Sequence, residues 1–228
     1  MSFYPIYLTR LSEKKVVLIG GDEEAERKAK ELLDFNVRLE IINSTLPESL
    51  IRLYRRGNFR WIDRPYRYGD LEDAAFVVAA EYDHDTAETI AQEARERNIL
   101  TNIMDNIPLS DSAFGSVIKQ GDLTISFSTN GLAPALAVRL KEKLQREVDE
   151  AYRKFLELAK KLRPYINEQI NDSELRKKLW YEWVDSEVID LLRQNRWNDA
   201  LKLTEEIWGE EIVVQKADIR VETISDSS

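Results

Sequence analysis

Short apolar runs alternate with amphipathic stretches through the first hundred residues, and this rhythm most constrains the fold. The run at residues 16–19 (Val-Val-Leu-Ile) is apolar at every position, which is typical of a strand buried on both faces of a parallel sheet. The stretches between such runs carry apolar residues at helical spacing. The pattern predicts an α/β fold with a Rossmann-like parallel sheet. We expect strands at residues 16–19, 37–42, 59–62, 74–80 and 99–104, and helices at 25–33, 47–56 and 87–94.

The pattern of alternating apolar runs and amphipathic stretches ends after residue 105. Residues 117–118 and 123–129 flank the segment 119–122, a pattern typical of a hairpin with Lys119 at its turn. From Ala133 onward the spacing is helical, and we expect Pro164 to end or kink one of these helices. The polar last dozen residues are expected to fray. We predict a sheet domain at 1–112, a hairpin-and-helix segment at 113–149 and a small helical C-terminal domain at 150–228.

Composition excludes several classes of protein. The net charge of -9 argues against a nucleic-acid partner, which would normally require a basic surface. No apolar run is long enough to cross a membrane and no signal peptide is visible, so we expect no membrane partner and a cytoplasmic location. The chain has no cysteine and a single histidine, His84, which we interpret as a surface residue rather than a metal ligand. The tryptophans of the helical part (Trp180, Trp183, Trp197 and Trp208) are interpreted as core or dimer-contact residues.

A glycine pair lies between the first strand and the first helix. Gly20 and Gly21 followed by Asp22, Glu23 and Glu24 give the strand, turn and helix in which a dinucleotide pyrophosphate rests on a helix N-terminus. Read as G-x-G-x-x-A, the segment has an aspartate where a glycine normally lets the backbone approach the phosphates. The alternative is a plain strand-to-helix turn that Asp22 caps.

A second polar segment follows the second strand. Asn43, Ser44 and Thr45 occupy the place where a dinucleotide-binding domain usually has an acidic residue for the ribose hydroxyls of NAD. Neutral side chains can also bind a ribose, and no local Arg or Lys favours NADP. The alternative is an ordinary polar turn before Pro47. Ala80, at the end of the fourth strand, completes the candidate cofactor residues.

Several blocks resemble, in order and spacing, the N-terminal module of siroheme synthases, the precorrin-2 dehydrogenase and sirohydrochlorin ferrochelatase family. The resemblance covers about the first 150 residues, and its combination of blocks is specific. The blocks are Tyr4-Pro5-Ile6-Tyr7-Leu8, residues 16–21 and 25–33, Ala79-Ala80, Asn102-Ile103-Met104-Asp105, and the turn and helix of residues 126–144. The departures are Asp22 in the loop, Phe35-Asn36-Val37 before the second strand, and Asn130 in the serine turn.

The resemblance implies an enzyme. Such proteins use NAD in the Rossmann domain to oxidise precorrin-2 to sirohydrochlorin, and some also insert Fe(II), which is a lyase reaction. They are homodimers in which the segment corresponding to 113–149 makes the interface. By position, Glu23, Glu24, Ser44 and Thr45 would line the NAD site and Asp105 would be the acidic residue needed for the chemistry. Asp105 could act as general base and hold Fe(II) transiently, without a fixed metal site; its alternative role is to cap the turn at 106–108.

The tetrapyrrole carries many carboxylates, so an acidic protein must offer local donors to it. The candidates are Lys119, Ser128, Asn130, Gly131 and Arg139, with Lys141 and Lys143 farther along the same predicted helix. The alternative for each cation is a solvated surface. Two other functions also stay open: a chelatase that lacks the dehydrogenase reaction, motivated by Asp22, and a non-catalytic Rossmann-like dimer that binds a tetrapyrrole.

Overall fold

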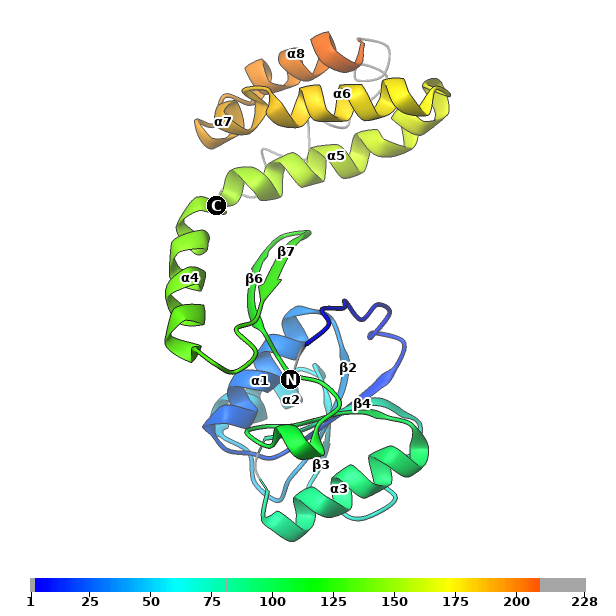
Figure 1. Cartoon of the computed structure of the whole chain (residues 1–228), viewed down its shortest axis with the longest axis vertical. Helices are drawn as coiled ribbons and strands as arrows, with labels where there is room; N and C mark the ends of the chain where they lie inside the picture. Colours follow the sequence, from blue (N-terminus) through cyan, green and yellow to red (C-terminus); the bar gives the residue numbers. More distant parts are fainter. Residues whose placement is uncertain (1–2, 81, 210–228) are drawn as a thin grey trace. The chain divides into compact units, whose positions relative to one another are not determined.

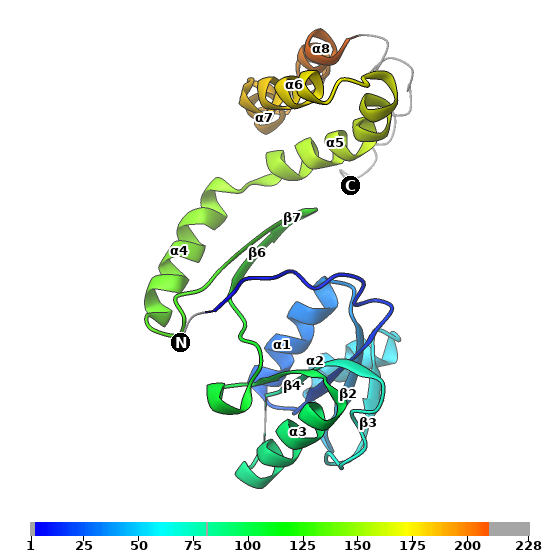
Figure 2. The same ribbon diagram turned by 45° about the vertical axis from the view of Figure 1, so that its right-hand side comes forward.

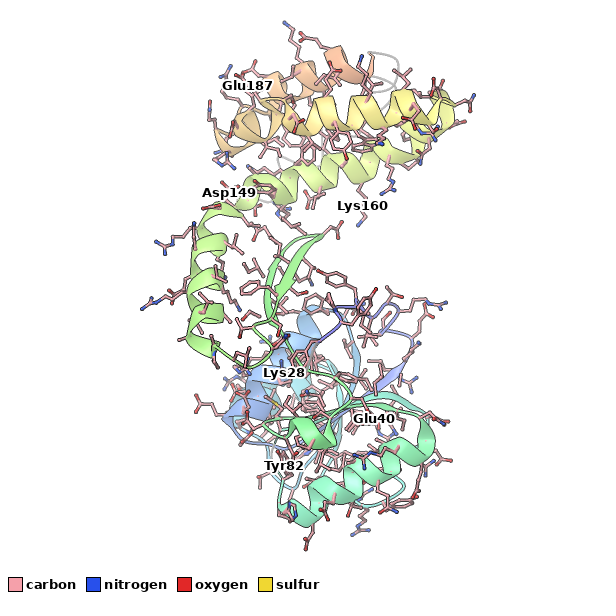
Figure 3. The ribbon with its side chains drawn as sticks, viewed as in Figure 1. Lys28, Glu40, Tyr82, Asp149, Lys160 and Glu187 are labelled. Atoms are coloured by element: carbon pink, nitrogen blue, oxygen red, sulfur yellow. The ribbon has the colours of Figure 1, made fainter. Side chains whose placement is uncertain are left out.

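The computed structural model describes residues 3–80 and 82–209, so the predicted frayed tail lies outside the described residues. Contacts divide the chain into two compact units, Met1–Phe114 and Gly115–Ser228. The boundary follows Phe114, whose ring packs against Phe76 at a centroid distance of 5.9 Å and lies 3.6 Å from the Nζ atom of buried Lys28, labelled in Figure 3. The predicted division of the second unit at residue 150 stays a prediction.

The first unit is built on a parallel sheet with strand order β3-β2-β1-β4-β5 (Figure 1). This confirms the predicted Rossmann-like class. The strands are β1 Lys15–Ile19, β2 Arg38–Ile42, β3 Arg60–Ile62, β4 Ala74–Ala79 and β5 Leu100–Ile103. The helices are α1 Glu23–Asp34, α2 Glu48–Arg55 and α3 His84–Arg97, with the 3-10 turn η1 at Ile107–Leu109. Each predicted strand is present, and no bound differs from its prediction by more than one residue.

Both faces of this sheet are covered, which explains the fully apolar strand runs. On one face Leu18 and Ile41 pack with Ala29 and Leu32 of α1 and with Leu50 of α2. On the other face, alternate strand residues pack against α3, namely Val17, Ile19, Val77 and Ala79 with Ala87, Ile90, Ala91 and Ala94. The two cores bury both faces of the sheet, so a functional site on this sheet is expected at the ends of its strands.

The second unit begins with a two-stranded antiparallel hairpin, β6 Ser116–Gln120 and β7 Leu123–Phe127. The prediction that Lys119 lies at the turn is wrong, because Lys119 pairs with Thr124 within the ladder. Gly121 has a φ of 59°, which suits a two-residue hairpin loop and allows pairing up to Gln120 and Leu123. Helix α4, Pro134–Glu147, lies alongside this hairpin (Figure 2).

The remaining helices are α5 Glu150–Gln169, α6 Ser173–Asp185, α7 Val188–Arg193 and α8 Trp197–Trp208. They share a core in which Trp183 and Trp208 are buried and make tilted or edge-to-face ring contacts with each other and with Trp180. Phe155 contacts Trp183, and Trp197 packs against the same cluster, so the interpretation of these tryptophans as core residues is confirmed. Of the two outcomes predicted for Pro164, an end or a kink, the end is wrong, because α5 continues through Pro164 to Gln169. Its buried stripe continues from Leu158 and Leu162 on to Ile166, and this packing outweighs the one backbone hydrogen bond that proline removes. No helix in the described ranges is long and apolar enough to cross a membrane.

Candidate functional site

The carboxyl ends of the five strands lie level with one another. Ile19 is opposite both Ile42 and Ala79, Ile42 is opposite Ile62, and Ala79 is opposite Ile103. Each pairing is continued by the next residue, because backbone N–H groups of Gly20, Asn43, Ala80 and Met104 donate to the neighbouring strand end at 2.9–3.3 Å. The candidate residues that follow β1, β2, β4 and β5 therefore share one edge of the sheet.

Successive strands of this parallel sheet are added first on one side of β1 and then on its other side. The connection from β1 goes to β2 on one side, and β4 lies on the other side of β1. In open α/β sheets a ligand binds in the crevice at such a switch point, outside the carboxyl ends of the strands. Gly20 directly follows β1 and Ala80 directly follows β4, the two strands that border this switch point, and the Ala80 N–H donates to the Ile19 carbonyl at the end of β1.

Asp22 caps the helix that begins at this edge. Its carboxylate accepts a hydrogen bond from the backbone N–H of Ala25 at 2.8 Å, and its own backbone is extended, with φ -80° and ψ -174°. The capping role left open by the sequence is therefore present. The N–H groups of Glu23 and Glu24 precede the helical hydrogen-bond ladder, which begins with Glu26 donating to the Asp22 carbonyl. These two groups are the first-turn donors that a phosphate could use.

The first turn of α1 is strongly acidic, with Glu23, Glu24 and Glu26 after the cap. Hydrogen bonds from Arg27 lower the pKa of Glu24, and a hydrogen bond from Lys30 lowers the pKa of Glu26. Both carboxylates are thus held in their charged form by cations of the same helix. Asp22 and Glu23 are exposed beside them.

The loops after β1 and β2 are in contact. A Cβ atom on Gly21 would lie 2.2 Å from the Thr45 carbonyl oxygen and 2.3 Å from the Asn43 side-chain nitrogen, so only glycine fits there. The Asn43 amide donates to that same Thr45 carbonyl at 3.0 Å, and the Trp61 indole donates to the Asn43 carbonyl at 2.8 Å. This places Asn43 and exposed Ser44 and Thr45 beside the glycine turn, where the adenosine side of a dinucleotide would need them.

Asp105 comes two residues after β5, in a left-handed conformation with φ 61° and with its side chain exposed. The turn that follows is closed by Ser110, whose hydroxyl lies 2.8 Å from the Asn106 carbonyl and 3.0 Å from that of Ile103. Helix η1 has Asn106 as its N-cap, without a side-chain cap bond. The Ser110 hydroxyl thus closes the loop after Asp105, and the choice between the two roles of Asp105 stays open.

Tyr82 is a neighbour of Asp105 that sequence reasoning missed. Its hydroxyl donates to the Met104 carbonyl, and Figure 3 labels it between β4 and α3. Burial, followed by the negative charge of Asp105, raises the pKa of Tyr82. Tyr82 thus ties the end of β4 to the residue before Asp105. Its position just past the fourth strand was the one available signal, since residues there share an edge with those after the fifth.

The remaining candidate residues belong to the second unit. Ser128 Oγ accepts from the Asn130 backbone N–H at 3.0 Å, and Asn130 and Gly131 are both left-handed, with φ 53° and 76°. Arg139 is exposed on α4 and pairs with Glu142 at 2.8 Å. The structure brings Ser128, Asn130 and Gly131 into one turn before α4. Their role toward a substrate stays a prediction.

The described ranges, 3–80 and 82–209, hold no group of three or more His, Cys, Asp or Glu side chains that could bind a metal ion. His84 is the first residue of α3 and is exposed, with Nε2 3.4 Å from Glu88. Its interpretation as a surface residue is confirmed.

The fold and the edge define a Rossmann-type domain joined to a hairpin-and-helix unit. Three family models match successive parts of the chain: putative NAD(P)-binding at residues 7–116, sirohaem biosynthesis protein central at 120–147, and sirohaem synthase dimerisation region at 151–207. The chain belongs to the family of siroheme synthase N-terminal modules, as the resemblance predicted.

Curated relatives agree with this family. The chain is 27% identical over 206 residues to a siroheme synthase of Pseudomonas aeruginosa (strain PAO1), which covers 90% of this chain and 44% of the relative. It is 28% identical over 180 residues to siroheme synthase 1 of Serratia proteamaculans, covering 79% and 38%. The chain thus spans less than half the length of these relatives. Among solved structures, SirC, a precorrin-2 dehydrogenase, matches with a TM-score of 0.71 and 21% identity, covering 90% of this chain and all of SirC, which shows a shared fold.

Proposed function

We propose that this protein is an NAD-dependent precorrin-2 dehydrogenase that produces sirohydrochlorin. The observation that carries the proposal is the level carboxyl edge, which gathers the glycine turn, Ala80 and Asp105 around the switch point of a parallel sheet. The names of the relatives support the same reaction, since they include siroheme synthases and a precorrin-2 dehydrogenase.

The edge fits a dinucleotide. The backbone N–H groups of Glu23 and Glu24 would hold the pyrophosphate, and Gly20 and Gly21 leave the turn free of side chains at that point. Asn43, Ser44 and Thr45 would bind the adenosine ribose, and Ala80 would lie beside the cofactor where β4 ends. Bound NAD would supply a hydride acceptor. The exposed carboxylates of Asp22 and Glu23 lie at the same turn and do not favour an anion.

Oxidation of the substrate removes a hydride and a proton. We assign the proton to the Asp105 carboxylate, which acts as general base at the same edge. The closure of the turn by Ser110 leaves this carboxylate available, and Tyr82 fixes the backbone just before it. Asp105 is thus supported from both sides by contacts that do not use its own oxygens.

Substrate carboxylates would be bound by the second unit. Lys119 and Arg139 supply cations, and Ser128 with the left-handed pair Asn130 and Gly131 supplies hydroxyl and backbone donors in one turn. Arg139 is already paired with Glu142, so it would have to exchange that partner for the substrate.

We propose that the protein acts as a homodimer. The match of residues 151–207 to a sirohaem synthase dimerisation region supports this. Helix α4, which precedes that region, supports it separately, because it has no buried residue and its Leu136 and Val138 are 52% and 54% exposed. Apolar side chains exposed to this extent along one helix are typical of a surface that another protein covers.

Insertion of Fe(II) into sirohydrochlorin is a second candidate reaction for the same residue. The observation that favours it is the exposed Asp105 carboxylate, because an oxygen ligand binds a divalent metal weakly enough to release it to the product. In this reaction the carboxylate would also accept the pyrrole protons that the metal displaces.

The test is an anaerobic assay of purified protein with precorrin-2 and NAD, comparing the wild type, Asp105→Asn and Asp111→Asn. We expect Asp105→Asn to lower the oxidation rate by about 10²- to 10⁴-fold, the usual contribution of a general base. Asp111→Asn removes another exposed carboxylate of the same loop and should leave the rate unchanged. NAD affinity should be equal in all three.

The same samples separate the alternatives. Fe(II) insertion by the wild type without NAD-dependent oxidation would identify a chelatase. Binding of sirohydrochlorin without either reaction would identify a tetrapyrrole-binding dimer. Either result would contradict the proposed dehydrogenase.

A further inference from the structure

We propose that Asp22 is an internal competitor of the cofactor pyrophosphate and that it sets how tightly this protein binds NAD. The inference rests on the proposed NAD site, which it deepens. It assigns Asp22 a role in determining cofactor affinity. This role differs from helix capping, although both involve the hydrogen bond that Asp22 accepts from the Ala25 N–H.

The first observation is the position of the carboxylate. Asp22 Oδ1 takes the backbone N–H of Ala25 at 2.8 Å, which is a donor of the first turn of α1. The first-turn N–H groups of a helix are the ones that a phosphate binds when it rests on a helix N-terminus. An acidic side chain of the protein therefore occupies the Ala25 N–H, the next first-turn donor after those of Glu23 and Glu24, and lies beside the two donors proposed for the pyrophosphate.

The second observation is the charge at the same place. Asp22 and Glu23 are exposed and carry negative charge directly at the turn where the pyrophosphate would lie. Glu24 and Glu26 have cationic partners in Arg27 and Lys30, so they compete less. The favourable partial charge of the helix N-terminus is thus already balanced by side chains before any ligand arrives.

The third observation concerns Gly21. The backbone of this glycine lies directly against the loop after β2, since an added Cβ would overlap Thr45 and Asn43. The turn therefore cannot shift toward that loop to move Asp22 away from an incoming phosphate. NAD must either displace the Asp22 side chain from Ala25 or bind beside it against like charge.

The experiment is isothermal titration of the full-length protein with NAD, using the wild type, Asp22→Asn and Asp22→Gly. Asparagine caps a helix as well as aspartate does, so Asp22→Asn removes only the charge. Asp22→Gly removes both the charge and the competing acceptor. We expect NAD to bind about tenfold more tightly to Asp22→Gly than to the wild type, with Asp22→Asn in between.

A matched control separates this effect from the general loss of a cap. Asp172 caps α6 in the second unit by accepting from the N–H groups of Glu174 and Leu175 at 2.9 and 3.2 Å. Asp172→Gly should leave NAD affinity unchanged. Because salt screens exposed charges, the ratio of dissociation constants between the wild type and Asp22→Asn should also shrink as ionic strength rises.

Three outcomes decide the matter. Tighter binding in the order given, with the salt dependence, supports the proposal. Equal or weaker NAD binding by folded Asp22→Asn and Asp22→Gly overturns it, while the dehydrogenase function stands. If NAD binds to none of the proteins at millimolar concentration, the cofactor site itself is contradicted and the inference falls with it.

Discussion

Helices α1 and α4 differ in what covers their apolar faces. Helix α1 buries Ala25, Lys28, Ala29 and Leu32 against its own sheet, whereas α4 buries no residue. Within the first unit both sheet faces are covered by helices of the same chain. The comparison indicates that the sheet faces are covered within one chain, while α4 leaves its apolar face exposed, as the proposed dimer surface would require.

The largest effect should follow from placing charge on α4. Leu136 and Leu140 are one helical turn apart, so Leu136→Asp with Leu140→Asp puts carboxylates on the proposed dimer surface. With about 2 kcal/mol for each buried leucine, we expect at least about 4 kcal/mol of lost dimer stability, or about a thousandfold weaker association. Analytical ultracentrifugation measures this. Gln145→Asp on the same helix is the control, and an unchanged dimer in the double variant would argue against this surface.

The same truncation should have different costs in the two regions. Leu18 is fully buried between the sheet and α1, and we expect Leu18→Ala to lower the free energy of unfolding by about 3 kcal/mol. Leu136→Ala, measured at concentrations where the protein is monomeric, should change it by less than about 0.5 kcal/mol. Urea unfolding of both variants gives the comparison, and equal losses would contradict the distinction drawn between α1 and α4.

The glycine turn should be the least tolerant part of the functional edge. Gly21→Ala forces a Cβ onto the Thr45 carbonyl, so the two loops must separate. We expect a loss of about 2 kcal/mol in unfolding free energy, as for other overpacked sites. Ser44→Ala in the facing loop is exposed and should leave stability nearly unchanged. Thermal unfolding of both variants tests this, and a stable Gly21→Ala protein would show that the loops can move apart freely.

The smallest effect concerns pH and the loop before β4. Burial alone would raise the pKa of Asp70, but hydrogen bonds from the Arg64 side chain and the Arg67 N–H outweigh it and lower that pKa below its ordinary value of 3.8. A lowered pKa adds stability above the unfolded value, and this stability is lost as the pH falls through the folded value. Asp70→Asn should therefore cost about 1 kcal/mol near pH 7 and less near pH 2, because the stability is lost as the pH falls through the lowered pKa.

Denaturant unfolding at both pH values measures this difference. Asp73→Asn is the matched control, because Asp73 is an exposed carboxylate of the same loop. If both variants lose the same stability at both pH values, the ion pair of Asp70 and Arg64 is not the cause.

The sequence predicted the sheet and its edge well, because a strand buried on both faces must be apolar at every position. It also placed the candidate residues after β1, β2, β4 and β5, since residues that follow parallel strands share one edge. The hairpin was predicted, but the position of Lys119 was not, because the loop length depends on the backbone angle of Gly121.

Other features depend on contacts that residue spacing does not encode. The continuation of α5 past Pro164 results from packing on both sides of the proline. The hydrogen bond from Tyr82 to Met104 joins segments that only the folded sheet brings together. Whether Asp22 served as a cap or stood in a phosphate loop was open in the sequence for a related reason: both roles use N–H groups of the same first helical turn.

A crystal structure of the protein saturated with NAD would test the central claim most directly. The account predicts the pyrophosphate at the backbone N–H groups of Glu23 and Glu24 and the nicotinamide ring next to the Asp105 carboxylate. A nicotinamide bound away from the end of β5, with Asp105 facing only solvent, would contradict the proposed chemistry even though the fold would stand.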